Sequence, residues 1–198
     1  YVRILSFIQN LPIRPVVSAF TATATERVRE DIRSSLELRH PCELVSGFDR
    51  ENLYFEVKHV RDKKEQIQSY MEEHREDSGI IYCATRKGVD ELYLYLENLG
   101  FSVGRYHAGM GAEVRRREQE EFIYDRTKVM IATNAFGMGI DKSNVRYVLH
   151  FNMPQSMENY YQEAGRAGRD GAPAECILYY SPQDTMINRY LLESKENY

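Results

Sequence analysis

The chain has 198 residues, of which 42% are hydrophobic and 28% are charged, and its formal net charge is −4. This length suffices for about one to one and a half domains, and the composition excludes disordered, collagen-like and disulfide-stapled proteins. The negative balance excludes a chain coated with basic residues, so any contact with nucleic acid must come from local clusters or backbone amides.

The sequence also indicates whether the protein crosses a membrane and whether its cysteines bind a metal. No apolar run approaches the roughly 18–20 residues that span a bilayer, and the chain opens with Tyr1 rather than Met. We therefore expect no membrane partner, a cytoplasmic protein, and a chain that is part of a longer one. The cysteines lack zinc-type spacing, so we expect three small buried thiols and no metal site, at Cys42, Cys83 and Cys176.

The first 45 residues read as a separate piece of structure. Pro15–Phe20 is a strand candidate, and Thr23 and Glu26 have the spacing of a capping box. The helix that follows has apolar residues one turn apart, at Val28, Ile32 and Leu36. Because one strand and one helix cannot bury their apolar faces alone, we interpret residues 1–45 as the tail of another domain that packs loosely. A linker is expected around residues 42–52.

From Leu53 onward, short apolar strands alternate with helical periodicity roughly every 20 residues. The expected strands are Leu53–Val60, Gly79–Cys83, Phe101–Tyr106, Val129–Ala132, Val145–Phe151 and Glu175–Tyr180. The expected helices contain Ile67–His74 and Val89–Leu96, span Ala112–Tyr124, run from a Ser156 cap to Gly165, and begin at Ser181–Asp184. This alternation predicts an α/β fold of three layers, with a central, mostly parallel sheet flanked by helices. We assign this domain to residues 46–185 and the start of a following segment to residues 186–198.

Loops at the carboxyl ends of parallel strands commonly carry function. After Gly79–Cys83, Thr85 and Arg86 precede a helix, a combination that suits a phosphate group. An N-cap threonine beside solvated cations explains the same residues. After the next strand, His107 and Gly109 belong to a turn of small residues that lets a backbone approach closely. An ordinary tight turn is the alternative there.

The loop after Val129–Ala132 is more informative. It contains Thr133, Asn134, Gly137, Gly139 and Asp141. Two glycines two residues apart free backbone N–H groups for an anion. The Asp141 carboxylate can accept from a ribose hydroxyl or orient an arginine. A glycine-rich crossover with a capping aspartate is the alternative interpretation.

The strongest signal is the glycine-rich segment Gln162–Gly171, which carries Arg166 and Arg169. Arginines three residues apart on a helical turn point to the same side, and arginine stays charged and binds phosphate bidentately. The sequence contains no G-x-x-x-x-G-K-[ST] phosphate loop and no Asp-Glu pair after a buried strand. We therefore predict that both arginines reach a nucleotide held by another piece of protein. Two surface arginines on a loop are the alternative.

In their order along the chain, these segments resemble the conserved motifs of the RecQ family of superfamily 2 helicases. The resemblance covers essentially the whole chain, and it is most specific in Ser46–Leu53, Ala135–Lys142 and Tyr160–Gly171. DEAD-box RNA helicases usually have a His-Arg pair where Gln162 and Glu163 stand, which favours the RecQ branch.

The resemblance implies a RecA-like fold with ATP bound between two lobes. Residues 1–45 would end the first lobe, which would hold ATP and Mg²⁺, and the rest would form the second lobe. Arg169 and Arg166 would contact the γ-phosphate, and the nucleotide cleft would also include Gly139, Asp141 and Gln162. The residues that would face DNA are Thr85, Arg86, His107, Gly109, Thr133 and Asn134. Zinc would belong only to a downstream module that this chain does not include.

The expected function is the second motor lobe of a 3′-to-5′ ATP-dependent DNA helicase, acting in DNA repair and recombination. Its partners would be the first lobe and DNA, as single strands and duplex junctions, at the bacterial nucleoid in the cytoplasm. We expect the isolated chain to be inactive, because the ATP-holding lobe is missing. Two other interpretations stay open: a nucleic-acid-binding module without motor activity, and the lobe of an RNA helicase.

Overall fold

The computed structural model describes residues 2–21, 24–45, 49–137 and 140–196, with only the backbone for residues 2 and 190–196. The chain divides into two compact units, Tyr1–Asp49 (unit 1) and Arg50–Tyr198 (unit 2). Unit 2 holds most of the regular secondary structure.

The described residues of unit 1 form two helices, α1 (Val2–Gln9) and α2 (Glu26–Ser35). The N-cap of α2 is Thr25, whose hydroxyl accepts a hydrogen bond from the backbone N–H of Val28. The expected capping box was therefore wrong in its register, since Glu26 is the first residue of the helix and lies too early to complete one. Thr23 itself lies outside the described residues.

The expected strand at Pro15–Phe20 was wrong. These residues have no regular secondary structure, and the side chains of Val16 and Phe20 are 97% and 95% exposed. A strand needs the backbone of a neighbour, and the described residues of unit 1 include no other strand. Among the described apolar side chains of unit 1, only Ile8 and Leu36 are buried, so this unit has a very small core.

Unit 2 is built on a parallel sheet of six strands in the order β1-β6-β5-β2-β4-β3. The strands are β1 (Leu53–His59), β2 (Ser78–Tyr82), β3 (Val103–Tyr106), β4 (Val129–Ala132), β5 (Val145–His150) and β6 (Ala174–Tyr180). Every residue of β2 and β4 is buried, as expected for central strands that are covered on both faces.

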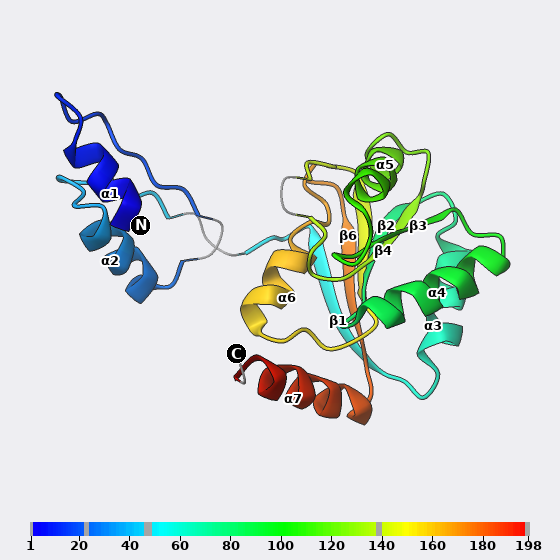
Figure 1. Cartoon of the computed structure of the whole chain (residues 1–198). Helices are drawn as coiled ribbons and strands as arrows, with labels where there is room; N and C mark the ends of the chain where they lie inside the picture. Colours follow the sequence, from blue (N-terminus) through cyan, green and yellow to red (C-terminus); the bar gives the residue numbers. More distant parts are fainter. Residues whose placement is uncertain (1, 22–23, 46–48, 138–139, 197–198) are drawn as a thin grey trace. The chain divides into compact units, whose positions relative to one another are not determined.

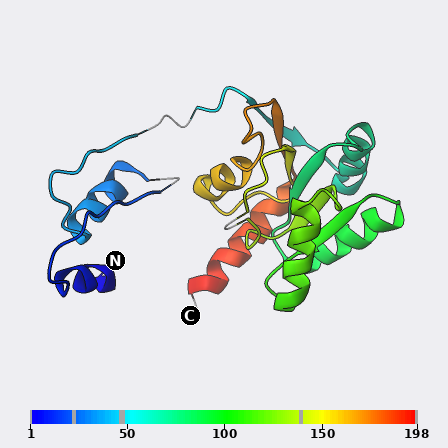
Figure 2. The ribbon, with the colours of Figure 1, turned by 90° about the horizontal axis from the view of Figure 1, so that it is seen from above.

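Two layers of helices cover this sheet, as Figure 1 shows from the side and Figure 2 from above. The helices are α3 (Lys63–Glu73), α4 (Arg86–Asn98), α5 (Ala112–Ile123), α6 (Met157–Ala164) and α7 (Pro182–Glu196). On one face, Ile81 packs with apolar residues of α3 and α4; on the other, Ile80 packs with Phe122 of α5 and Ala164 of α6. The three-layer α/β fold with a parallel sheet is confirmed.

The ends of two helices lie where the sequence predicts them. Gly100 has a φ of +81° just after α4, the left-handed conformation that closes a helix. The Ser156 hydroxyl accepts from the N–H of Asn159 and caps α6.

Of the cysteines, Cys83 and Cys176 are buried, and burial raises the pKa of each thiol to about 12. Cys42 is exposed, which corrects the expectation of three buried thiols.

Candidate functional site

The backbone segments that carry the candidate residues lie at two opposite edges of the sheet in unit 2, and the Arg166 side chain reaches from its edge to Gly137, three residues after Asn134. The six residues expected to face nucleic acid follow the carboxyl ends of β2, β3 and β4. Residues 165–173, here called the arginine loop, connect α6 to β6 and lie at the amino edge, where the N–H of Gly168 donates to the carbonyl of Val145 (2.9 Å). The long loop after β4 runs from one edge to the other before β5 begins at Val145.

Arg166 is held against the loop that follows β4. Its Nη1 donates to the carbonyl of Gly137, and Gly137 has a φ of +117°. A Cβ at this glycine would lie 2.1 Å from the Arg166 Cζ, so only glycine leaves room for the guanidinium. In the described part of the structure, the buried Nε of Arg166 has no hydrogen-bond partner.

The buried Tyr82 at the end of β2 lies beside this arginine. Its hydroxyl donates to the carbonyl of Phe136 at 3.3 Å. Burial raises the pKa of Tyr82, and the positive charge of Arg166 partly opposes that rise. The hydroxyl therefore stays protonated at neutral pH, and the cation has a neutral neighbour.

Arg169 is the more accessible of the two arginines. Its Nη1 donates to the carbonyl of Ile140 (2.9 Å) and lies 3.4 Å from the Asp141 carboxylate, one of the two interactions that the sequence suggested for Asp141. The side chain of Asp141 is 94% exposed, so this ion pair is weak. Gln162 is exposed on α6, four residues before Arg166. Gly139 lies outside the described residues.

Three residues that hold the arginine loop were not predicted from the sequence. Arg50 and Asn52, which both lie just before β1, donate to carbonyls of the loop. From β5, Arg146 contacts both carboxylate oxygens of Asp170 at 2.7 Å and holds the pKa of that carboxyl below its usual range. Arg50 and Asn52 stand in one of the most family-like stretches, and that was their only signal in the sequence.

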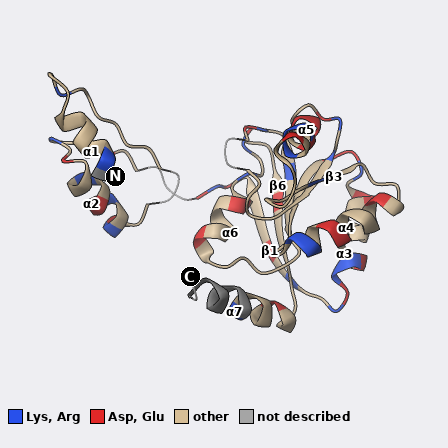
Figure 3. Ribbon diagram, viewed as in Figure 1, with Lys and Arg blue, Asp and Glu red and all other residues tan. Residues whose placement is uncertain are grey.

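At the carboxyl edge, the loop after β2 forms the beginning of α4. The Thr85 hydroxyl accepts from the N–H of Gly88 (3.0 Å) and caps the helix. Arg86, the first residue of α4, is exposed, and Figure 3 shows basic residues at this helix start. A positive helix terminus with an exposed arginine can attract an anion.

The remaining four residues of this edge differ in exposure. His107 is 7% exposed; its Nδ1 accepts from the N–H of Gly109 (3.2 Å), and its Nε2 lies 3.3 Å from Asp90. Thr133 is buried as well, whereas Gly109 and Asn134 are exposed. The imidazole of His107 therefore shapes the turn from inside rather than presenting a nitrogen at the surface.

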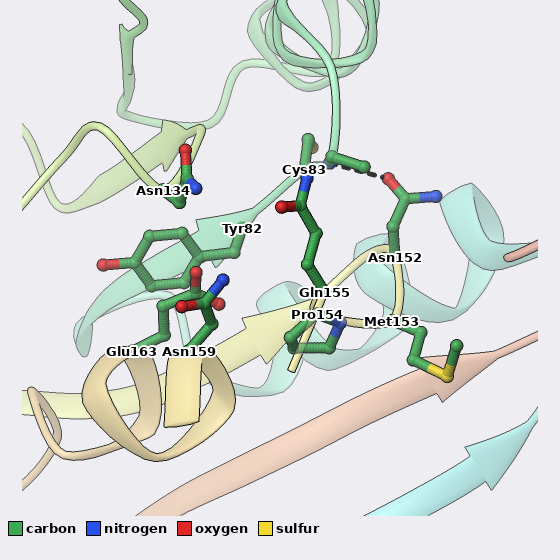
Figure 4. A pocket seen from close by; sticks show the side chains of 10 residues that line it. Tyr82, Cys83, Asn134, Asn152, Met153, Pro154, Gln155, Asn159 and Glu163 are labelled. Atoms are coloured by element: carbon green, nitrogen blue, oxygen red, sulfur yellow. Dashed lines mark hydrogen bonds between the residues drawn. The ribbon is translucent and has the colours of Figure 1, made fainter. Parts of the chain in front are cut away.

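A small polar cavity lies among the ends of β2, β4 and β5 (Figure 4). Its volume is about 40 Å³, which is room for about one water molecule rather than a nucleotide. It is lined by Tyr82, Cys83, Ala84, Asn134, Asn152, Met153, Pro154, Gln155, Asn159 and Glu163. The carboxylate of Glu163 lies 2.9 Å from Nε2 of the fully buried His150, whose ring stacks on Tyr82.

A buried ion pair fixes the loops behind this edge. The Lys63 ammonium lies 2.6 Å from the Asp184 carboxylate, and Asp184 also accepts from the side chain of Asn152 (3.0 Å). Asn152 in turn accepts from the N–H of Ala84 (3.1 Å), next to Thr85. Burial lowers the pKa of Lys63, and the Asp184 charge opposes that shift. The pair thus links α3 and α7 to the loop that starts α4.

Features of two other site classes are absent from the part of the chain that the structure describes. Within the described residues, no group of three or more His, Cys, Asp or Glu side chains could hold a metal ion. No helix in the same part of the chain is both long and apolar enough to cross a membrane.

Known proteins resemble this chain in both sequence and fold. Residues 62–171 match the family model of the helicase conserved C-terminal domain. The ATP-dependent DNA helicase RecQ of Bacillus subtilis is 48% identical over 189 residues, which cover 96% of this chain and 32% of the relative. That of Haemophilus influenzae is 43% identical over 188 residues, covering 94% and 30%. The chain thus spans about a third of the length of these relatives.

Comparison with solved structures shows which fold the chain shares with known proteins. A structure of S. cerevisiae Dbp5 bound to RNA and ADP BeF3 matches with a TM-score of 0.74 at 24% identity, covering 97% of this chain and 52% of that one. A DEAD box protein from Methanococcus jannaschii matches with a TM-score of 0.60 at 23% identity, covering 73% and 40%. These likenesses show a RecA-like fold. The chain therefore belongs to the helicase conserved C-terminal domain family, in its RecQ branch.

Proposed function

We propose that this chain works as the second motor lobe of an ATP-dependent DNA helicase that moves 3′ to 5′. The observation that carries the proposal is the arginine loop, in which Arg166 and Arg169 lie side by side against Gly137 and Ile140. Two cations fixed on a glycine-lined edge match what the γ-phosphate of ATP requires. The names of the RecQ relatives support the same activity.

In this proposal, Arg169 is the first arginine finger and Arg166 the second. Arg169 is partly exposed, and Arg166 has an Nε without a partner among the described residues. The Arg169 side chain therefore has N–H groups to offer to phosphate oxygens. In P-loop enzymes an arginine finger accelerates hydrolysis by about 10³–10⁵. Asp141, Gln162 and Gly139 complete this wall of the nucleotide cleft.

ATP and Mg²⁺ are held mainly by the first lobe in this scheme. The described residues offer arginines but no cluster of carboxylates for a metal, so this chain supplies one wall of the pocket. Residues 1–45 are the end of the first lobe, residues 46–185 are the second lobe, and residues 186–198 begin the following segment, of which the part up to Glu196 belongs to α7.

The carboxyl edge is the proposed contact with the tracking DNA strand. Thr85, Arg86, Gly109 and Asn134 are exposed there and meet backbone phosphates, while the buried His107 and Thr133 shape the loops. Contacts with phosphates carry no sequence information, so they suit a motor that must move along any sequence. Few donors are needed, which is compatible with a net charge of −4.

The two edges together explain movement. ATP attracts Arg166 and Arg169 across the cleft and draws the lobes together. Hydrolysis removes that attraction and lets the lobes separate. Because DNA phosphates are held at the other edge, each closing and opening displaces the strand relative to one lobe.

The test is Arg169→Ala in the full-length protein that contains this chain. ATP turnover should fall by about 10³-fold, while nucleotide affinity stays within several-fold and DNA affinity is unchanged. Arg117→Ala on α5 is the control, because Arg117 is a largely exposed arginine outside the arginine loop; its turnover should stay within about twofold. Wild-type turnover in Arg169→Ala would refute the finger.

The nature of the nucleic acid needs a separate measurement. Dbp5, which shares the fold, was solved with RNA, whereas the RecQ relatives are named as DNA helicases. With matched DNA and RNA duplexes that carry 3′ tails, we expect the DNA duplex to be unwound and the RNA duplex to stay paired. A module that binds nucleic acid without motor activity would bind the tails and hydrolyse no ATP.

A further inference from the structure

Two side chains next to the start of β1 grip the arginine loop from more than 110 residues away in the sequence. The Arg50 Nη2 donates to the carbonyls of Ala167 (3.1 Å) and Gly168 (2.8 Å). The Asn52 Nδ2 donates to the carbonyls of Gly168 (2.8 Å) and Ala172 (2.9 Å). The Nε of Arg50 also donates to the Oδ1 of Asn52 (3.4 Å). The two side chains therefore act as one unit, here called the β1 clasp, and both bind the carbonyl of Gly168.

The loop is shaped to receive this clasp. Gly168 has a φ of +55°, a left-handed conformation that favours glycine. A Cβ at Gly168 would lie 2.5 Å from the Nδ2 of Asn52 and 2.8 Å from the carbonyl of Ala172. The amide of Asn52 therefore occupies the space that any other residue at position 168 would fill.

The clasped carbonyls stand next to the two arginines in the chain. The carbonyl of Gly168, the backbone nitrogen of Arg169 and the Cα of Arg169 belong to one planar peptide unit, so fixing the carbonyl restricts where the Cα of Arg169 lies. Ala167, whose carbonyl Arg50 binds, directly follows Arg166. On the other side, the N–H of Gly168 donates to Val145, which leaves this part of the loop little freedom to rotate.

We infer that Arg50 and Asn52 are positioning residues for the two arginine fingers. They touch neither the nucleotide nor the DNA in this scheme, and they act by setting the conformation of residues 166–169. The inference rests on the proposed function, because it concerns the placement of groups that meet the γ-phosphate. A displacement of about 1 Å at a reacting centre costs about 10²-fold in rate, so a loosened loop should slow hydrolysis without weakening ATP binding.

Two conservative variants of the full-length protein test this. Asn52→Asp keeps the size of the side chain but replaces the donor Nδ2 with an oxygen that faces the same two carbonyls. Arg50→Lys keeps the charge but replaces the planar fork that reaches two carbonyls and Asn52. For each, kcat of ATP hydrolysis should fall by about 10- to 100-fold, with the KM for ATP within threefold and the DNA affinity within twofold of wild type. The melting temperature reports whether the fold survives.

The chain offers a matched control for the arginine variant. Arg14 donates through one Nη to two consecutive carbonyls, those of Leu36 and Glu37, both at 2.9 Å. This is the same kind of contact at the end of another helix, away from the arginine loop in sequence. Arg14→Lys should keep kcat within about twofold of wild type.

A double-variant cycle separates positioning from a general structural effect. If the clasp acts through the two fingers, adding Asn52→Asp to a variant that carries both Arg166→Ala and Arg169→Ala should lower kcat no further than that variant alone. Full multiplication of the two losses would overturn the inference. Wild-type kcat in both clasp variants, with Arg169→Ala inactive, would overturn it and leave the proposed function intact. Active Arg169→Ala would instead refute the proposed function.

A clasp variant that fails to fold also gives a defined outcome. If Asn52→Asp fails to fold, Arg50→Lys decides: a lower kcat with an unchanged melting temperature supports positioning, and a wild-type kcat overturns it. If neither variant folds, the clasp holds the whole lobe together and the positioning role is overturned.

Discussion

The two edges of the sheet in unit 2 solve different problems with similar residue types. At the amino edge, the arginine loop is bound from β1, from β5 and from the Gly137 loop, and its arginines lie on backbone carbonyls. At the carboxyl edge, Arg86 and Asn134 are exposed, while the fixed contacts lie behind them in the Lys63–Asp184 pair. Rigid cations suit one phosphate that must be met in one geometry, and exposed donors suit a strand that is gripped and released.

Asp184→Asn should give the largest effect and would test the support of the carboxyl edge. The variant leaves the Lys63 ammonium, which is 10% exposed, without its charged partner. Breaking a buried pair on one side costs about 3–5 kcal/mol, and chemical denaturation should show that loss. Glu91→Gln removes the exposed partner of Lys87 (3.6 Å) and should cost about 0.5 kcal/mol or less. Equal losses in both variants would contradict this account of the edge.

Gly137→Ala should displace the Arg166 side chain from its contact with Gly137 without removing any charge. The added Cβ overlaps the Arg166 guanidinium, so this arginine must leave its place and ATP turnover should fall by about 10²-fold. Gly100→Ala is the control, because Gly100 also has a positive φ but a Cβ added there would meet nothing within 4 Å. It reports backbone strain alone. Equal turnover in the two variants would show that the place of Arg166 on Gly137 does not matter.

Arg86→Gln should affect the carboxyl edge alone. If Arg86 contacts a DNA phosphate, its loss should weaken binding about tenfold at low salt and reduce the salt-dependence slope of log K by about 1. Fluorescence titration at several salt concentrations measures both. Lys87→Gln makes the same charge change at the neighbouring position, where the lysine is 86% exposed and lies near Glu91. An equal effect of the two substitutions would mean that only general charge matters at this helix start.

The smallest effect concerns the pH dependence of the Arg146–Asp170 pair. Arg146 holds the pKa of Asp170 below its usual range, so the folded value lies below the unfolded value of about 3.9. The contribution of this pair to stability is therefore complete above the unfolded pKa and is lost as the pH falls through the folded one. Below about pH 4, Arg146→Met and Asp170→Asn should both lose stability less steeply than wild type. Wild-type slopes in both variants would show that the pair contributes nothing.

Local periodicity was enough to predict most of unit 2 from the sequence. Val129–Ala132 is a strand with the predicted bounds, and Ser156 caps α6 as predicted, because burial and capping are set by residues close in sequence. The predicted strand at Pro15–Phe20 failed for the opposite reason. Its formation depends on a partner strand, which local sequence does not supply.

The candidate site shows the same division. Arg166 and Arg169 were recognisable because the glycines around them stand in the same segment. The clasp residues Arg50 and Asn52 lie 116 to 120 residues from the carbonyls they bind, so only the fold brings them together. The burial of His107 was equally hidden, because its partner Asp90 comes from α4.

The most direct test of the central claim is a structure of the full-length protein with a bound, non-hydrolysable ATP analogue. We predict that guanidinium nitrogens of Arg169 and Arg166 lie about 3 Å from γ-phosphate oxygens, with the β1 clasp still on the carbonyl of Gly168. A structure in which both guanidinium groups point away from the triphosphate would contradict the account.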